Sequence, residues 1–137
     1  MMVNTERGEV FLNFNQIRRV IVEGDDGLKV VFNGQKDTSG EVEHVFRDKK
    51  AVASLLGEVR KCSRFIQLGA GKKDDLREYV DFDFVQMVFF ERSSSGSSPD
   101  KASVQFLDGT RREYSGDYAR QIEFYVTYPG YHVDSVE

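Results

Sequence analysis

Several features are scarce in this 137-residue chain, and each scarcity excludes a class of protein. It has one cysteine (Cys62), two prolines, two histidines and no tryptophan. A single cysteine excludes an internal disulfide and a multi-cysteine zinc site, and it favours the reducing cytoplasm. No apolar run approaches the roughly 20 residues that cross a bilayer. Residues 1–7 have neither the basic start nor the apolar stretch of an export signal. We therefore expect a cytoplasmic protein with no membrane partner.

The chain also lacks a dominant charge. It has 19 basic and 23 acidic residues, a net charge of −4. Residues 1–64 hold 11 basic and 10 acidic groups (net +1), whereas residues 65–137 hold 8 and 13 (net −5). Neither half is a basic domain, which argues against strong non-specific binding to nucleic acid. A local basic patch is still compatible with these numbers.

An internal repeat organises what is present. Residues 11–23 align with residues 79–91 at an offset of 68. Three of the thirteen aligned pairs are identical, namely Phe14/Phe82, Val20/Val88 and Glu23/Glu91, and seven further pairs are chemically similar. Because fixed-period similarity indicates a repeated structural unit, we predict a duplication. Two unrelated hairpins that converged on one period are the alternative.

Each predicted repeat contains several strands followed by one helix. We place repeat 1 at about residues 9–62, repeat 2 at about 65–128 and a tail at 129–137. A unit of about 65 residues buries little apolar surface alone. We therefore predict an α+β fold in which two tandem β-rich repeats pack as one pseudo-twofold domain. The sequence leaves open whether the repeats share one sheet or pack face to face.

Capping and turn residues define the expected helices and one hairpin. Asp48 is a good N-cap for a helix that runs to about Lys61. Ser115 is the expected cap of a second helix, with Tyr118, Ile122 and Val126 on its apolar face. Asp108-Gly109 is a strong hairpin signal between two strands.

The residue patterns indicate no catalytic residues, no metal site and no cofactor. The two histidines lack partners at the spacing of a triad or a two-histidine metal site. Asp81 and Asp83 stand two apart on a predicted strand and could hold a hard cation. In repeat 1 the matching residues are Asn13 and Asn15, which favours a structural turn in both copies.

Basic pairs recur along the chain. Neighbours on a strand point to opposite faces, so a pair such as Arg18-Arg19 offers at most one charge per face. We interpret most of these pairs as solvated surface. Loop and hairpin pairs could still converge on phosphates, and the residues of this alternative nucleic-acid site are Lys72, Lys73, Arg111 and Arg112.

The aromatic residues favour self-association. The chain has 11 Phe and 6 Tyr. Phe89 and Phe90 are adjacent on a predicted strand, so one ring lies on each face of the sheet. If the chain does not cover both faces, another chain must cover one of them. This pattern motivates a homodimer hypothesis.

The layout of two strand-rich runs, each followed by a hairpin turn and a helix, resembles the LytTR class of bacterial DNA-binding domains. The resemblance covers most of residues 10–126, and its closing portion is carried by Asp108-Gly109-Thr110, Ser115 and Tyr118-Ala119. It implies a DNA-binding regulator. The chain departs from that family after residues 65–68, where Gly69-Ala70-Gly71 stands in place of the His-Arg-Ser-like contact segment. A pleckstrin-like or other duplicated module has the same layout, and we assign no family.

Together these patterns favour a small, non-enzymatic, cytoplasmic protein-interaction or assembly module whose partner is a protein or a second copy. The first alternative is the DNA-binding regulator. The second alternative is a small-molecule-binding domain with its ligand in a cleft between the two halves.

Overall fold

The computed structural model describes residues 1–23, 27–32, 42–69, 77–92, 96 and 98–128. We call residues 1–61 the N-terminal unit and residues 65–127 the C-terminal unit. The N-terminal unit contains, in order, β1 (Met2–Thr5), β2 (Gly8–Phe11), η1 (Phe14–Gln16), β3 (Ile17–Val22), β4 (Leu28–Phe32), β5 (Val42–Phe46) and α1 (Lys49–Lys61). The C-terminal unit contains β6 (Phe65–Leu68), β7 (Arg77–Asp81), η2 (Phe82–Phe84), β8 (Val85–Arg92), β9 (Pro99–Phe106), β10 (Arg111–Ser115) and α2 (Asp117–Thr127). The predicted α+β class is confirmed.

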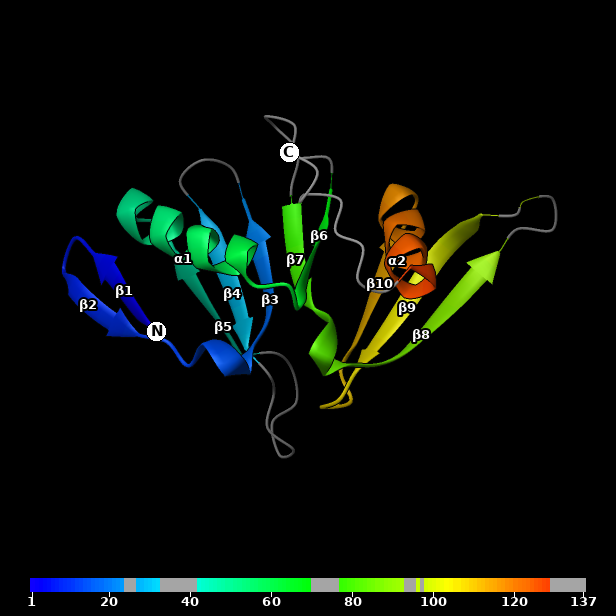
Figure 1. The fold of residues 1–137 in the computed structure, drawn as a ribbon, viewed down its shortest axis with the longest axis horizontal. Helices are drawn as coiled ribbons and strands as arrows, with labels where there is room; N and C mark the ends of the chain where they lie inside the picture. Colours follow the sequence, from blue (N-terminus) through cyan, green and yellow to red (C-terminus); the bar gives the residue numbers. More distant parts are fainter. Residues whose placement is uncertain (24–26, 33–41, 70–76, 93–95, 97, 129–137) are drawn as a thin grey trace.

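The strands form three antiparallel sheets (Figure 1). The largest has the order β5-β4-β3-β7-β6, the second has the order β10-β9-β8, and β1 pairs with β2 alone. Strands β6 and β7 belong to the C-terminal unit by sequence but extend the sheet of the N-terminal unit. The two units therefore share one sheet through this hairpin.

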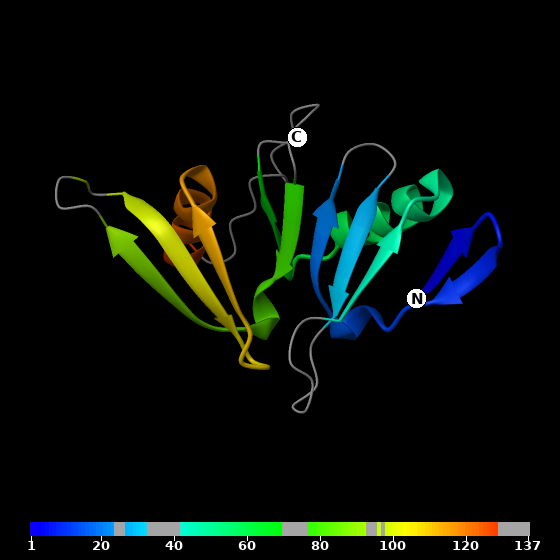
Figure 2. The same cartoon turned by 180° about the vertical axis from the view of Figure 1, so that it is seen from behind.

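The β6–β7 hairpin contributes to both hydrophobic cores, because alternate residues of a strand point to opposite faces. Phe65 and Tyr79 lie in the first core, which α1 covers. Ile66, Leu68 and Val80 lie in the second core, which α2 covers together with β9 and β10. Seen from behind, β3, β4 and β5 lie in front of α1, and β9 and β10 lie in front of α2 (Figure 2).

The first helix and the hairpin turn form as predicted. The Asp48 carboxylate accepts a hydrogen bond from the backbone N–H of Lys50 at 2.9 Å, and α1 ends at Lys61. Gly109 has φ +90°, and the Phe106 N–H donates to the Thr110 carbonyl at 2.9 Å around this turn. A positive φ favours glycine, which explains the Asp-Gly signal.

The second helix differs from the prediction in its cap and its buried face. Ser115 ends strand β10, and the N-cap is Gly116 with φ +61°. The buried residues of α2 are Ala119, Ile122 and Tyr125. Val126 is exposed. The predicted apolar face of residues 118, 122 and 126 therefore lies beside the face that is buried. An i, i+4 spacing alone does not show which side of the helix meets the core.

The strand pairing of the two units is irregular at corresponding residues. The ladder of β3 with β4 shifts register between Ile17 and Arg19, and the ladder of β8 with β9 shifts between Val85 and Met87. The short 3₁₀ turns η1 and η2 are also 68 residues apart. The first unit includes the hairpin β1–β2, which begins before the predicted start at about residue 9. The duplication itself and its pseudo-twofold packing stay predictions.

Candidate functional site

The junction between the units contains buried charges. Arg18 is fully buried, forms an ion pair with Asp108 and donates to Thr110 Oγ1 at 2.6 Å. Its guanidinium carbon also lies 4.6 Å from the ring centroid of Phe106. This arginine of β3 thus binds the β9–β10 hairpin of the other unit.

A second buried group joins β3, β7 and β10. Arg19 Nη1 lies 3.1 Å from Glu78 Oε2, and the Tyr114 hydroxyl donates to the same carboxylate. Burial, followed by the negative charge of Glu78, raises the pKa of the Tyr114 hydroxyl. Tyr114 therefore stays protonated and acts as a donor at neutral pH.

The burial of Arg18 and Arg19 corrects the interpretation of this basic pair as solvated. Both side chains contact groups of the C-terminal unit, although neighbours on a regular strand point to opposite faces. The register shift between Ile17 and Arg19 explains the difference, because a β-bulge places two residues against one on the partner strand.

Asp81 takes part in a local turn and in an ion pair. Its carboxylate accepts from the Asp83 N–H at 2.9 Å and lies 3.3 Å from Arg64 Nε. Burial raises the pKa of Asp81, although the Asp83 N–H and the Arg64 charge oppose this rise. The turn contact agrees with the interpretation of the Asp81/Asp83 pair as structural.

Each of these charges meets an oppositely charged partner, and the pairs of Arg18 and Arg19 cross between the two units. Buried ion pairs are poor evidence of stability, and in some proteins they favour one register of pairing. Two strands at corresponding places elsewhere in the fold, β8 and β2, expose apolar side chains instead.

Strand β8 is the first such place, because its outer edge has no neighbour among the described strands. Its side chains Met87 and Phe89 are 52% and 65% exposed. The edge strand β10 differs, since Arg111, Arg112 and Glu113 are charged and exposed. Charged side chains protect an edge from pairing, whereas an apolar edge favours it.

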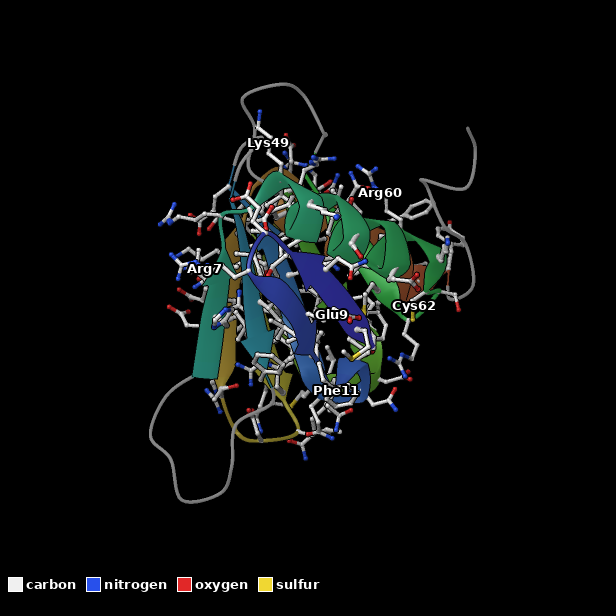
Figure 3. All side chains as sticks on the ribbon, turned by 90° about the vertical axis from the view of Figure 1, so that its left-hand side faces the viewer. Arg7, Glu9, Phe11, Lys49, Arg60 and Cys62 are labelled. Atoms are coloured by element: carbon white, nitrogen blue, oxygen red, sulfur yellow. The ribbon has the colours of Figure 1, made fainter. Side chains whose placement is uncertain are left out.

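Strand β2 is the second place, at the opposite end of the longest axis (Figure 1). It pairs with β1 alone, so its other edge is open among the described strands. Phe11 is 66% exposed, and Met2 and Val10 are exposed as well. Figure 3 shows Glu9 and Phe11 on this hairpin, at the near end of the molecule and in front of the N-terminal sheet.

A groove of about 670 Å³ lies between the β1–β2 hairpin, β5 and the start of α1. Its lining residues are Thr5, Glu6, Arg7, Val10, His44, Val45, Phe46, Arg47, Asp48 and Lys49. The groove lies within the N-terminal unit, whereas the second alternative expected a ligand cleft between the halves. The small-molecule hypothesis stays a prediction.

The structure describes two of the four residues of the nucleic-acid alternative. Arg111 and Arg112 are exposed on β10, and Arg111 Nε donates to Gln105 Oε1 at 3.2 Å. Lys72 and Lys73 lie outside the described residues, as does His132 of the tail. The DNA-binding hypothesis therefore stays a prediction.

The described residues bring no three His, Cys, Asp or Glu side chains together as a metal site. In the same part of the chain, no helix has the length and apolar character that a bilayer crossing requires. The sequence analysis missed the hairpin that contains β2, because it began repeat 1 at about residue 9 and assigned no strand before it. Val3 and Val10, which face each other across the hairpin, were the available apolar signal.

No family model matches the chain, and neither a curated protein nor a solved structure matches it.

Proposed function

We propose that the chain is a non-enzymatic protein-interaction or assembly module of the cytoplasm, built from two copies of one ancestral unit. It would bind a protein through the open edge of β8. In strand addition, main-chain hydrogen bonds supply affinity and alternate side chains supply specificity.

The duplication is supported by the ladders. The β3/β4 pairs Val20↔Val30 and Val22↔Leu28 correspond to the β8/β9 pairs Val88↔Val104 and Phe90↔Ala102. The β5 and β10 residues also correspond at an offset of 68, since Phe46 faces Leu28 and Tyr114 faces Ala102. Convergence of two hairpins does not predict a shared bulge position.

One observation carries the interaction proposal. Strand β3 lies between two neighbours, β4 and β7, whereas its counterpart β8 has a neighbour on one side only. The residues of β3 are almost all buried, whereas β8 exposes two apolar residues, Met87 and Phe89. An apolar strand with an open edge has the properties of a pairing site.

The test is covalent capture in living cells that express the full chain. The photoreactive residue benzoylphenylalanine is placed at position 89, and at position 107 as a control, since Leu107 is also apolar and exposed. We expect position 89 to give a protein adduct that position 107 does not give. Equal capture at the two positions, or none at 89, would contradict the proposal.

A further inference from the structure

We infer that the partner is a second copy of this chain, and that β2 of one copy pairs with β8 of the next as β7 pairs with β3 within the chain. The inference rests on the proposed function, because it names the partner of the same β8 edge. It predicts the antiparallel pairs Met87↔Leu12, Val88↔Phe11, Phe89↔Val10 and Phe90↔Glu9.

The register follows from the internal junction. There the pairs are Arg19↔Val80, Val20↔Tyr79, Ile21↔Glu78 and Val22↔Arg77. An offset of 68 converts β3 into β8 and β7 into β2. The hairpins also correspond: Phe11 faces Met2 across β1–β2, and Tyr79 faces Gln67 across β6–β7. Each half of the internal contact therefore has a counterpart that no described strand covers.

Three residues that meet at the internal junction of β3, β7 and β10 are polar, and the residues at the corresponding positions of β8, β2 and β5 are all apolar. Within the chain, the buried group of Arg19, Glu78 and Tyr114 is polar. Its counterparts on the open strands and on β5 are Met87, Val10 and Phe46. The polar group is joined by an ion pair and a hydrogen bond, and all three of its positions carry apolar side chains at the open ends.

A second group changes in the same way. The Tyr79 hydroxyl accepts from Arg60 Nε and donates to Gln67 Oε1, both at 3.3 Å. The corresponding residues are Phe11, Tyr128 and Met2. They are again apolar or aromatic where the internal group is polar. All three are more than half exposed in the single chain.

These replacements argue for a matched apolar interface. The described residues include ten large apolar side chains that are exposed. Six of them occupy positions of the inferred contact, namely Met2, Val10, Phe11, Met87, Phe89 and Tyr128. In the paired state Met87 of one copy would reach the groove wall formed by Val10 and Phe46 of the next. A foreign partner would not require both complementary surfaces on one chain.

The contact joins two different surfaces, because β2 and β8 lie at opposite ends of the molecule (Figure 1). Such a head-to-tail contact closes into a ring or continues as an open chain. It therefore extends the homodimer hypothesis: the smallest species is a pair, and each pair retains one free end of each kind unless it closes.

Complementation tests the inference on the purified full chain. Phe11→Lys places a charge in the β2 surface, and Phe89→Lys places one in the β8 surface. By sedimentation velocity at increasing concentration, we expect the wild type to form species of two or more 15.7 kDa chains. Each variant alone should be monomeric, and a mixture of the two should form 1:1 pairs and nothing larger. Leu107→Lys, outside the contact, should behave as wild type.

The register is tested by disulfide formation in a Cys62→Ser background. A Phe11→Cys chain mixed with a Val88→Cys chain should give a cross-linked heterodimer on oxidation, because directly opposed residues are close enough to bridge. A Val10→Cys chain mixed with the same partner should give at least tenfold less, since residue 10 points to the other face.

The outcomes separate the two proposals. A monomeric wild type, or variants whose mixture does not pair, would overturn self-association. If position 89 still captures a different protein in cells, the interaction module stands with another partner. If position 89 captures nothing, both proposals fail.

Discussion

Strands β3 and β8 pair with their following strands in the same pattern, but their other edges have different neighbours. Both pair with the following strand, and both shift register at the same relative residue. Strand β3 is covered by β7 and contributes two buried arginines, whereas β8 ends the sheet and exposes Met87 and Phe89. Inside the chain the contact uses ion pairs, and at the open ends it offers apolar side chains.

The difference has a physical reason in chain connectivity. The β6–β7 hairpin is tethered to β3, so its effective concentration is high and the contact needs little net affinity. Buried ion pairs, which contribute little net stability but favour one register, are sufficient there. A contact between separate chains must also offset lost translational and rotational freedom, and apolar burial supplies that free energy.

The largest expected effect comes from breaking the covered junction. Glu78→Ala leaves Arg19 buried without its carboxylate, so we expect a loss of about 3–5 kcal/mol in the free energy of unfolding. The matched change at the open end, Val10→Ala, should cost less than about 1 kcal/mol. Urea denaturation in the Phe89→Lys background measures both without self-association. Equal losses of unfolding free energy in the two variants would contradict the contrast between a covered junction and an open end.

The next largest effect is expected when the residues of the β3–β7 junction are replaced by the apolar residue types of the open strands. The triple variant Arg19→Met, Glu78→Val, Tyr114→Phe replaces the polar group by its apolar counterpart. Since well-packed apolar groups often equal or exceed a buried ion pair, we expect a change between zero and a gain of about 4 kcal/mol. The single change Arg19→Met should destabilise the fold. A triple variant less stable than this single variant would contradict the correspondence.

The smallest effect concerns pH. Because the pKa of Asp81 is raised by burial, the native state binds its proton more readily than the unfolded state does. Stability contributed by Asp81 is therefore greatest below its unfolded pKa, and it falls as pH rises through the raised native pKa. Asp81→Asn should remove this fall while keeping an acceptor for the Asp83 N–H. We would measure urea midpoints between about pH 3 and pH 8.

The control for the pH experiment is Asp117→Asn, whose side chain is exposed on α2. This variant should keep the fall seen in the wild type. If Asp81→Asn keeps the same pH dependence as the wild type, another group is responsible for the fall.

Local signals in the sequence predicted the local structure well. The helix α1 begins after Asp48, and the Asp-Gly turn joins β9 to β10. Each of these depends on contacts within a few residues, such as a cap or a positive φ. The α+β class followed from their order.

Features that depend on distant contacts were not predicted. The burial of Arg18 requires a β-bulge and a carboxylate 90 residues away, and neither is visible in the local pattern. The second helix buries Tyr125 rather than Val126, because the position of the core selects the stripe. The open apolar edge of the candidate site was indicated only in part, by the adjacent rings of Phe89 and Phe90.

The sequence by itself determined the first helix, the Asp-Gly turn and the alignment of residues 11–23 with residues 79–91, since these rest on short-range propensity and pattern. Only the tertiary structure decided that the β6–β7 hairpin joins the first sheet and that the corresponding hairpin β1–β2 joins no other described strand. Strands β3 and β8 have similar local sequences, but β7 pairs with the outer edge of β3, and no described strand pairs with the outer edge of β8. That asymmetry leaves β2 and β8 as the surfaces to test.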